Sequence, residues 1–433
     1  MKKASHILYG TVLLTAANLL LRLVGVGFQV YLAGRIGAAG TGLLQLVLSV
    51  SALSFTVGAA GIRTCSTYLT ADALGRGKPG TIYAILSGCF RYSLMCSGTA
   101  AVCLWHFAAW IAEAWIGDAA AAPALRLCAL FLPARCFHGV LTGYFTSARK
   151  IEILVGTQFL EQGCSILVVY FLLSRWAGVE PGRACTAVTA GNCAGAALAF
   201  CVLMLLIPEG IGKKGRAPYR RIFDIAVPVA LADNLRSGLN TVEHLIIPKR
   251  LALFAWTVNA LGDYGVLHGM VFPVLMFPAA VMFSLAELMV PEFSLCAAGE
   301  RWPRVRYLAK RCLRVSLAYS LCVAGVLFLG AEALGEALYH DPAAGRFLRL
   351  YAPFVPVLYL DNIVDAMCKG LGQQKANAEY NALTSFLDVV FLWALLPRWG
   401  LGGYYFSFVV THFINFGLSV RKLALAAGLR RGK

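Results

Sequence analysis

Residues Ile151–Ser174 read IEILVGTQFLEQGCSILVVYFLLS, and this apolar stretch decides the fold class. A helix needs roughly 20 such residues to cross about 30 Å of hydrocarbon. Stretches of the same kind lie at 184–207 and 312–330. Of the 433 residues, 59% are hydrophobic and 14% are charged, with a mean hydropathy of +0.71, a balance that excludes an ordinary soluble domain. The sequence therefore predicts an all-α, polytopic membrane protein.

Twelve stretches of this kind are predicted to cross the bilayer. They cover 7–33, 41–66, 81–107, 124–146, 152–174, 184–207, 221–247, 265–290, 308–330, 346–368, 379–396 and 402–421. The first could instead be a signal peptide, because Lys2 and Lys3 precede it. However, the apolar run is too long for a signal peptide, and residues 33–35 form a poor cleavage site. We therefore expect an uncleaved first helix.

The basic residues indicate the membrane topology. When successive loops are assigned to alternate sides, one side holds 23 lysines and arginines and the other holds seven. The cytoplasmic loops of membrane proteins carry such an excess, so both termini are expected on the cytoplasmic side. Because topology accounts for the net charge of +17, no nucleic acid is expected as a partner.

The 14 cysteines lie mostly within the predicted helices, where they pack as small apolar residues. The sequence has no CxxC pair and no Cys/His spacing typical of metal ligands. Neither a disulfide framework, nor a metal site, nor a cofactor is therefore expected.

The two halves of the chain resemble each other at an offset of 223 residues. The offset aligns Asp118 with Asp341, and it aligns the segment 125–133 with 348–356, where Leu-Arg-Leu, an alanine, a phenylalanine and a proline recur. Shared apolar residues mean little in a membrane protein, whereas shared charged residues and prolines indicate a duplication.

Six helices in each half would give both halves the same orientation. Transporters built from parallel repeats have this arrangement, and their substrate site lies near the bilayer midplane between the repeats. We predict a six-helix lobe at 1–207, a cytoplasmic linker at 208–220 and a second six-helix lobe at 221–433.

Four arginines lie deep within predicted helices. Each costs roughly 2.5–3.5 kcal/mol on insertion scales unless it faces water, an acid or an anionic ligand. A guanidinium group is suited to phosphate through its parallel N–H donors. We predict that these residues bind an anionic substrate: Arg22, Arg63, Arg135 and Arg236. The alternative is pairing with buried acids, for example between Asp233 and Arg236.

Acidic residues within the predicted helices have two interpretations, as partners of the arginines or as proton or cation sites that couple transport. The candidates are Glu161, Asp233, Glu243, Asp361 and Asp365. Asp361 and Asp365 share one helix face because one turn separates them.

Prolines are expected to break the seventh and eighth helices, at Pro228, Pro273 and Pro278. A proline lacks the backbone N–H that continues a helix, and the freed groups can line a cavity or allow bending during transport. A kink without function is the alternative.

Several segments of the chain resemble one family of membrane proteins. They are DYGVLHGMVFPVLMFPAA at 263–280, LMVPEFS at 288–294, IIPKRL at 246–251, GLLQ at 42–45 after a Gly-Ala-Ala-Gly turn at 37–40, and KGLGQQK at 369–375. These segments are similar to those of the stage V sporulation protein B-like proteins. That family of polysaccharide-biosynthesis flippases belongs to the multidrug/oligosaccharidyl-lipid/polysaccharide exporter superfamily.

The resemblance implies two six-helix lobes that work by alternating access in the bacterial cytoplasmic membrane. The implied cargo is a saccharide linked to undecaprenyl pyrophosphate, for the synthesis of peptidoglycan, spore cortex or another polysaccharide. Related flippases use arginines on helices 1, 2 and 8. Arg22 and Arg63 match the first two, whereas the eighth helix here offers His268 and no arginine. The implied partners are this lipid-linked saccharide, membrane lipids and proteins of cell-wall synthesis.

Three other functions are open to this sequence. A multidrug/cation antiporter of the same superfamily would need a cavity dominated by acids and aromatic residues. A non-transporting membrane partner of wall synthesis is a second alternative. A membrane glycosyltransferase would need a large outer loop with catalytic acids, and the longest outer loops, near 248–264 and 331–345, are short, so no enzymatic activity is expected.

Overall fold

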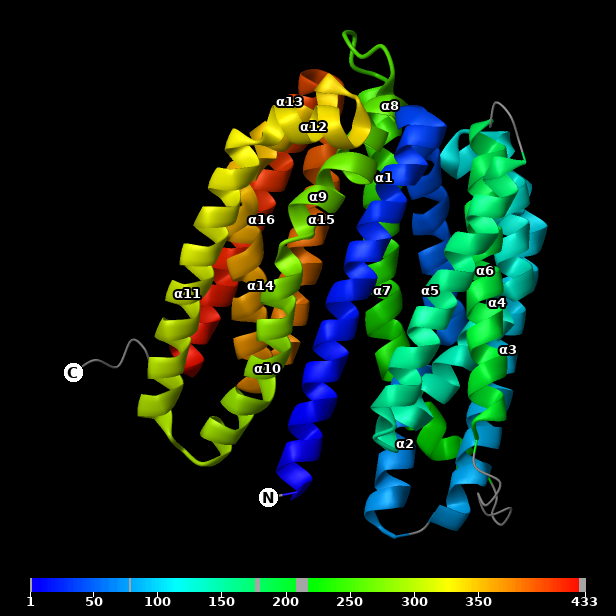
Figure 1. Ribbon diagram of the computed structural model, residues 1–433, viewed down its shortest axis with the longest axis vertical. Helices are drawn as coiled ribbons and strands as arrows, with labels where there is room; N and C mark the ends of the chain where they lie inside the picture. The colour runs from blue at the N-terminus through cyan, green and yellow to red at the C-terminus, as the bar shows by residue number, and fades with distance from the viewer. Residues whose placement is uncertain (1, 78, 176–179, 208–216, 428–433) are drawn as a thin grey trace. The chain divides into compact units, whose positions relative to one another are not determined.

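The computed structural model describes residues 2–77, 79–175, 180–207 and 217–427, and all regular structure in these ranges is helical (Figure 1). The chain forms two compact units, one of residues 1–21 and 43–241 and the other of residues 22–42 and 242–433. Of the predicted linker, residues 208–216 lie outside the described residues. The prediction of an all-α fold is confirmed.

Membrane-spanning character is clear from the helices themselves. Within the described ranges, ten helical stretches are long and apolar enough to cross a membrane. One of them, Ala16–Gly75, is 60 residues long and contains the first two predicted helices. The predicted helix at 221–247 falls within the less apolar α7 (Tyr219–Leu251), and the eighth begins in the short apolar segment Ala260–Met276.

The first unit is a bundle built around α4 (Figure 1). Its helices are both ends of α1 (Lys2–Ala59), then α2 (Ile62–Gly75), α3 (Ile82–Trp110), α4 (Ala122–Ser147), α5 (Ile151–Ser174), α6 (Pro181–Leu205) and the first part of α7. A π-helical segment, Ile111–Ile116, extends α3, and short 3₁₀ turns at Pro79–Thr81 and Ala119–Ala121 precede α3 and α4.

The beginning of the chain departs from the predicted spans. The segment 37–40, expected to form a turn between two helices, is a kink inside the continuous α1, with Gly37 at φ 69°. The helix instead ends at Ala59, because Ala60 (φ 44°) and Gly61 (φ 71°) adopt the left-handed conformation. The predicted helix at 41–66 is therefore two helices, and α2 starts shortly before Arg63.

The beginning of α7 is an integral part of the first unit. Ile222 and Ala226 are fully buried in an apolar core with residues of α2, α3 and α4. Gly61 lies so close to α7 that an added Cβ atom would stand 2.6 Å from the carbonyl oxygen of Ala226. Burial of apolar side chains therefore holds α7 in this bundle.

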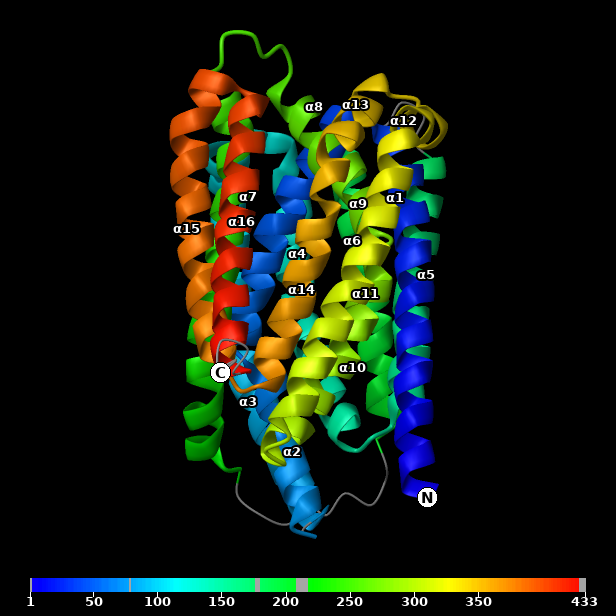
Figure 2. The ribbon, with the colours of Figure 1, turned by 90° about the vertical axis from the view of Figure 1, so that its left-hand side faces the viewer.

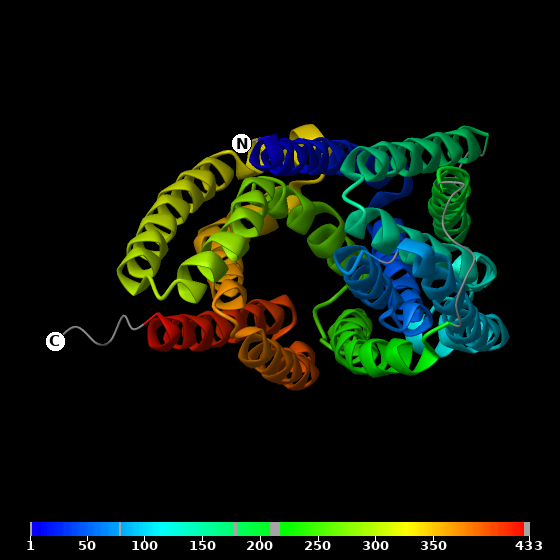
Figure 3. The same cartoon turned by 90° about the horizontal axis from the view of Figure 1, so that it is seen from below.

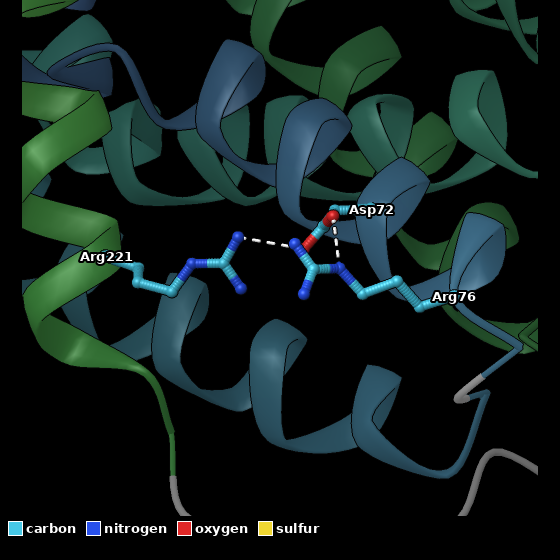
Figure 4. Close-up of polar contacts among 3 residues, drawn as sticks. All are labelled: Asp72, Arg76 and Arg221. Atoms are coloured by element: carbon cyan, nitrogen blue, oxygen red, sulfur yellow. Dashed lines mark hydrogen bonds and ion pairs between the residues drawn. The ribbon is translucent and has the colours of Figure 1, made fainter.

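An ion-pair cluster joins α2 to the first turn of α7 (Figure 4). One carboxylate oxygen of Asp72 accepts from Nε of Arg76 at 2.7 Å, and the other accepts from Nη2 of Arg221 at 2.8 Å. The arginine side chains are about half exposed or more, so solvent screens these pairs and each contributes little to stability. The main effect of the cluster is therefore to position the first turn of α7 next to α2, and its contribution to the stability of the fold is small.

The second unit contains residues 22–42 of α1, the end of α7 and all later helices. These are α8 (Ala260–Gly265), α9 (Phe272–Met276), α10 (Ala279–Ala298), α11 (Trp302–Leu329), α12 (Ala331–Tyr339), α13 (Pro342–Tyr351), α14 (Val355–Gly370), α15 (Gln374–Trp399) and α16 (Leu401–Ala426), with a π-helical segment Val266–Val271 and a 3₁₀ turn Ala352–Phe354. Within this unit, α14 and α16 pack side by side (Figure 2), and Figure 3 shows α16, in red, next to α15.

The predicted eighth helix is broken between α9 and α10. Pro273 is the second residue of α9, and Pro278 lies directly before α10, whereas α7 continues through Pro228 without interruption. Three tyrosine hydroxyl groups from other helices donate to carbonyl groups of the broken segment. The bonds run from Tyr339 to Met270 at 3.1 Å, from Tyr359 to Leu275 at 2.6 Å and from Tyr319 to Pro278 at 2.9 Å. Side chains thus satisfy backbone groups that a regular helix would pair internally.

Tyr359→Phe should therefore destabilise the second unit. Tyr359 is 1% exposed, and loss of its hydroxyl would leave the carbonyl oxygen of Leu275 without this donor, at a cost of about 1–3 kcal/mol. The unfolding midpoint of the purified protein in detergent measures the effect. Tyr405→Phe is a control, because no hydrogen bond is found for that hydroxyl among the described residues, and an equal loss in both variants would contradict a role for the bond to Leu275.

The predicted duplication has a local counterpart in the structure. Asp118 accepts a hydrogen bond from the backbone N–H of Ala120 at 2.9 Å, and the aligned Asp341 accepts one from Ala343 at 2.8 Å. Both aspartates act as N-caps of the helical turn that follows. These two aligned aspartates therefore have the same capping role in the two halves.

The second unit also contains a close approach between two helices. An added Cβ atom on Gly42 of α1 would collide with the carbonyl oxygen of Leu261 in α8. A Cβ on Gly265 would collide in the same way with the carbonyl oxygen of Ala38. Only glycine lets the two backbones meet at this distance.

Candidate functional site

A pocket of about 560 Å³ lies within the first unit, among α1, α2, α4, α5 and α7. Three of the four deep arginines line it: Arg63 from α2, Arg135 from α4 and Arg236 from α7. Their positions follow from the fold, because the glycine break before α2 and the burial of the α7 start bring these helices against α4. Gly143 of α4, for example, lies against the backbone of Arg63.

The three arginines have no carboxylate partner in the part of the chain that the structure describes, because none of its ion pairs within 4.0 Å involves them. Arg135 is half-buried, and its guanidinium carbon lies 5.2 Å from the ring centre of Phe55. Arg63 and Arg236 are exposed. Their N–H donors are available to a ligand.

Two acids and several neutral polar groups complete the lining. The acids are Glu161 from α5 and Asp233 from α7. The lining therefore holds two acidic side chains and three arginines, so positive charge is in excess. His138 and Gln158 are further lining residues, and Oε1 of Gln158 is buried without a hydrogen-bond partner. The alternative pairing of Asp233 with Arg236 is not formed as an ion pair, although both residues line the same pocket.

Arg22 belongs to the second unit. It is exposed on α1, and its guanidinium carbon lies 4.4 Å from the ring centre of Phe283 in α10. A cation–π contact of this kind contributes roughly 0.5–1 kcal/mol. No ion pair of the described residues involves Arg22. The structure thus brings together three of the predicted binding residues and assigns the fourth to the other unit.

The candidate coupling acids of the second unit lie in two groups. Glu243 of α7 and Asp388 of α15 are neighbours, and Asp388 accepts hydrogen bonds from Ser407 and Thr411 of α16.

The second group is formed around α14. Asp361 accepts from Asn415 at 2.9 Å, and Asp365 accepts from Asn377 at 3.1 Å. Sequence reasoning does not select the two asparagines, because a neutral amide costs less to bury than a charged side chain and is therefore less conspicuous. One signal for Asn415 is available in the sequence. Asn415 and Ser419 are one helical turn apart, as Asp361 and Asp365 are, so each pair places polar side chains on one helix face.

His268 is the residue that the eighth helix offers where related flippases use an arginine, and it does not line the pocket. Its ring is packed between Tyr264 and His244, at centroid distances of 4.7 and 4.9 Å, and the Tyr404 hydroxyl lies 3.2 Å from its Nε2. The side chain is part of the aromatic core of the second unit.

Chemically, the pocket of the first unit suits an anion. Three arginines from three helices surround it, and each offers the planar donor set that matches phosphate oxygens. In a partly dehydrated pocket such contacts are stronger than at an exposed surface.

Comparison with known proteins agrees with this picture. Residues 14–171 match the family described as MatE. Stage V sporulation protein B of Bacillus subtilis (strain 168) is 24% identical over 411 residues, which cover 92% of this chain and 79% of that protein. Sporulation protein YkvU of the same organism is 21% identical over 277 residues, or 61% of each protein.

Solved structures show the same fold. The inward-facing conformation of a multidrug resistance MATE family transporter of the MOP superfamily superposes with a TM-score of 0.76 at 12% identity, over 98% of this chain and 100% of that one. A MOP superfamily transporter from Pyrococcus furiosus Vc1 (DSM3638) superposes with a TM-score of 0.68 at 11% identity, over 97% and 95%. The predicted resemblance is therefore confirmed: residues 14–171 match the MatE family, stage V sporulation protein B is similar over 92% of the chain, and the chain is a polytopic, all-helical membrane protein with the MATE transporter fold.

Proposed function

We propose that this protein is a flippase that moves a lipid-linked saccharide with a pyrophosphate headgroup across the cytoplasmic membrane by alternating access. The observation that supports this most is the meeting of Arg63, Arg135 and Arg236 in one pocket without ion-pair partners in the described chain. Unpaired cations at membrane depth are costly unless a ligand or water faces them, and a pyrophosphate would offset that cost. An undecaprenyl carrier, and a role in peptidoglycan or spore-cortex synthesis, fit the likeness to stage V sporulation protein B.

In this mechanism the headgroup enters the pocket from the cytoplasm while the lipid tail remains in the bilayer. The guanidinium groups replace the water that hydrates the phosphates. Arg22, the fourth predicted arginine, lies in the second unit and is a further candidate for contact with the anionic substrate. An inside-negative potential favours outward movement of an anion by about 2.3 kcal/mol per charge per 100 mV, so that voltage alone supplies part of the driving force.

A multidrug/cation antiporter is the second candidate, and Glu161 and Asp233 in the pocket speak for it. In the Pyrococcus furiosus transporter with this fold, a reversed polarity of the binding pocket suggests a different function. Pocket charge can therefore be decisive in this superfamily, and the excess of arginine here favours an anionic cargo. A membrane partner of wall synthesis that does not transport is the third candidate.

The test compares the two kinds of cargo in one system. The purified chain is reconstituted into liposomes with a fluorescent saccharide on undecaprenyl pyrophosphate, and headgroup translocation is followed with an impermeant quencher. We expect translocation that inorganic pyrophosphate inhibits and that accelerates when the acceptor side is positive. An organic cation such as ethidium, tested in the same liposomes, should not be transported.

Transport of the cation without translocation of the saccharide would replace the proposal by the antiporter. Translocation of neither cargo would favour the non-transporting partner. A fluorescent phosphatidylcholine serves as the control for unspecific lipid scrambling.

A further inference from the structure

The ends of α7 and α15 in the second unit carry positive charges that the arginine pocket does not account for. Lys249 and Arg250 lie in the last turn of α7, and Arg398 lies in the last turn of α15. The two helix ends meet, because an added Cβ atom on Gly400 would lie 2.6 Å from the ring of Phe254. The topology prediction assigns these three cations to the outer side of the membrane, which holds only seven lysines and arginines.

Arg250 is held in place without an acceptor for its donors. Its guanidinium carbon lies 4.2 Å from the ring centre of Trp393, and Nε is buried without a hydrogen-bond partner. No ion pair of the described residues involves Arg250 or Arg398. A cation–π contact attracts the charge but supplies no acceptor oxygen. The N–H groups of Arg250 are therefore suited to an anion that the chain itself does not provide.

The level of this surface in the membrane follows from α15. The helix is long and apolar enough to cross a membrane. Its 26 residues extend over about 39 Å, whereas the hydrocarbon core is about 30 Å thick, so its last turn lies among the headgroups. Tryptophan is enriched at that level, and three exposed tryptophans lie on or between these elements: Trp256, Trp393 and Trp399.

An apolar stripe on α15 leads to this place. Leu383, Phe386 and Val390 are exposed, and their spacing of three and four residues puts them on one helix face with Trp393. Such a face suits the acyl chains of a lipid, and the cations at its end suit the phosphate of the same molecule. A guanidinium group binds phosphate oxygens through parallel N–H donors.

We propose that the ends of α7 and α15 bind an anionic phospholipid. Arg250 donates to the lipid phosphate, Trp393 positions the guanidinium group, and Lys249 and Arg398 contribute charge. This inference goes beyond the proposed function, because it concerns a resident membrane lipid outside the arginine pocket and does not depend on the cargo.

Native mass spectrometry of the purified full-length protein in detergent tests the proposal. The protein is titrated with phosphatidylglycerol and, separately, with phosphatidylcholine. We expect the first phosphatidylglycerol molecule to bind at least tenfold more tightly than phosphatidylcholine. Arg250→Gln should weaken this first binding step at least tenfold, and Trp393→Leu should weaken it about fivefold. Size-exclusion profiles and helical circular dichroism confirm that each variant is folded.

Two control variants separate lipid binding from the effects of charge alone. Arg346→Gln removes an exposed arginine of α13 that is predicted on the same side of the membrane, and it should retain the first binding step. Arg250→Lys keeps a cation at the end of α7, where it interacts favourably with the helix dipole, but loses the planar donors. It should bind phosphatidylglycerol more weakly and unfold in lipid-free detergent at the wild-type midpoint.

Two competitors identify the source of the phosphate. Neither inorganic phosphate nor undecaprenyl pyrophosphate should displace the first phosphatidylglycerol molecule. Displacement by inorganic phosphate would indicate a site for a free anion, and displacement by undecaprenyl pyrophosphate would assign the surface to the cargo, so either result would overturn the proposal.

Unchanged binding of phosphatidylglycerol in folded Arg250→Gln would equally overturn it, as would equal binding of the two phospholipids by the wild type or an equal loss in Arg346→Gln. None of these results decides whether the arginine pocket translocates a saccharide, because Arg250 does not line that pocket.

Discussion

Replacing Arg135 by alanine is expected to reduce headgroup translocation about 100-fold. The residue is half-buried on α4 and lines the pocket with Arg63 and Arg236. A hydrogen bond to a charged group contributes roughly 1.5–3 kcal/mol, and 1.4 kcal/mol corresponds to a factor of ten. Loss of one bidentate contact to a phosphate therefore removes on the order of 3 kcal/mol. Initial translocation rates in proteoliposomes with equal amounts of protein measure the effect.

Two further variants distinguish a specific role of the Arg135 guanidinium group from a general effect of removing an arginine. Arg135→Lys keeps the charge and loses the planar pair of donors, so a loss of about tenfold is expected. Arg126→Ala changes an exposed arginine in the first turns of the same helix, outside the pocket lining, and should behave like the wild type. The pocket hypothesis would be contradicted if Arg135→Ala translocated the headgroup at the wild-type rate, or if Arg126→Ala lost as much translocation activity as Arg135→Ala.

Gly42→Val is expected to have the largest effect on stability. Its side chain would collide with the carbonyl oxygen of Leu261 and would also stand close to the Cα atom of Gly265. Backbone atoms cannot rotate away as the end of a side chain can, so overpacking here should cost about 3 kcal/mol. A lower unfolding midpoint in detergent and a lower yield of monodisperse protein would show this.

The comparison variant lies on the same helix. Gly34→Val places the same side chain on α1 where no atom lies within 4 Å of the added Cβ, so its midpoint should stay near that of the wild type. Both variants replace a helical glycine by a β-branched residue, and the difference between them isolates the contact with α8. Equal midpoints would show that the close approach is not a source of stability.

Much of the fold follows from the sequence because the bilayer imposes a simple length rule. The stretch Ile151–Ser174 is a helix with these bounds in the structure, and most other spans agree within a few residues. The predicted spans are wrong at Gly37 and Gly61, where the backbone conformation of a glycine determines the helix boundary, and the break predicted at Pro228 does not form. Glycine permits both a kink and a helix end, and only the neighbouring helices select between them.

The candidate site is predictable in part. A charged residue in an apolar helix is conspicuous, so the sequence alone singles out the four deep arginines, and the structure gathers three of them in one pocket. Their placement inside the first unit depends on the association of α7 with α2 and α4, which no local pattern encodes. Asn377 and Asn415 escape prediction because an amide becomes informative only when its neighbours are known.

The contact between Gly42 and Leu261 also explains why this sequence is recognisable. The segments 42–45 and 263–280, which carry much of the family resemblance, lie next to the two sides of one close backbone contact. A change on either side alone should be selected against, so these positions should covary across homologues although they are distant in the chain. The resemblance in these two segments therefore reflects steric fit between two helices, which does not depend on the cargo.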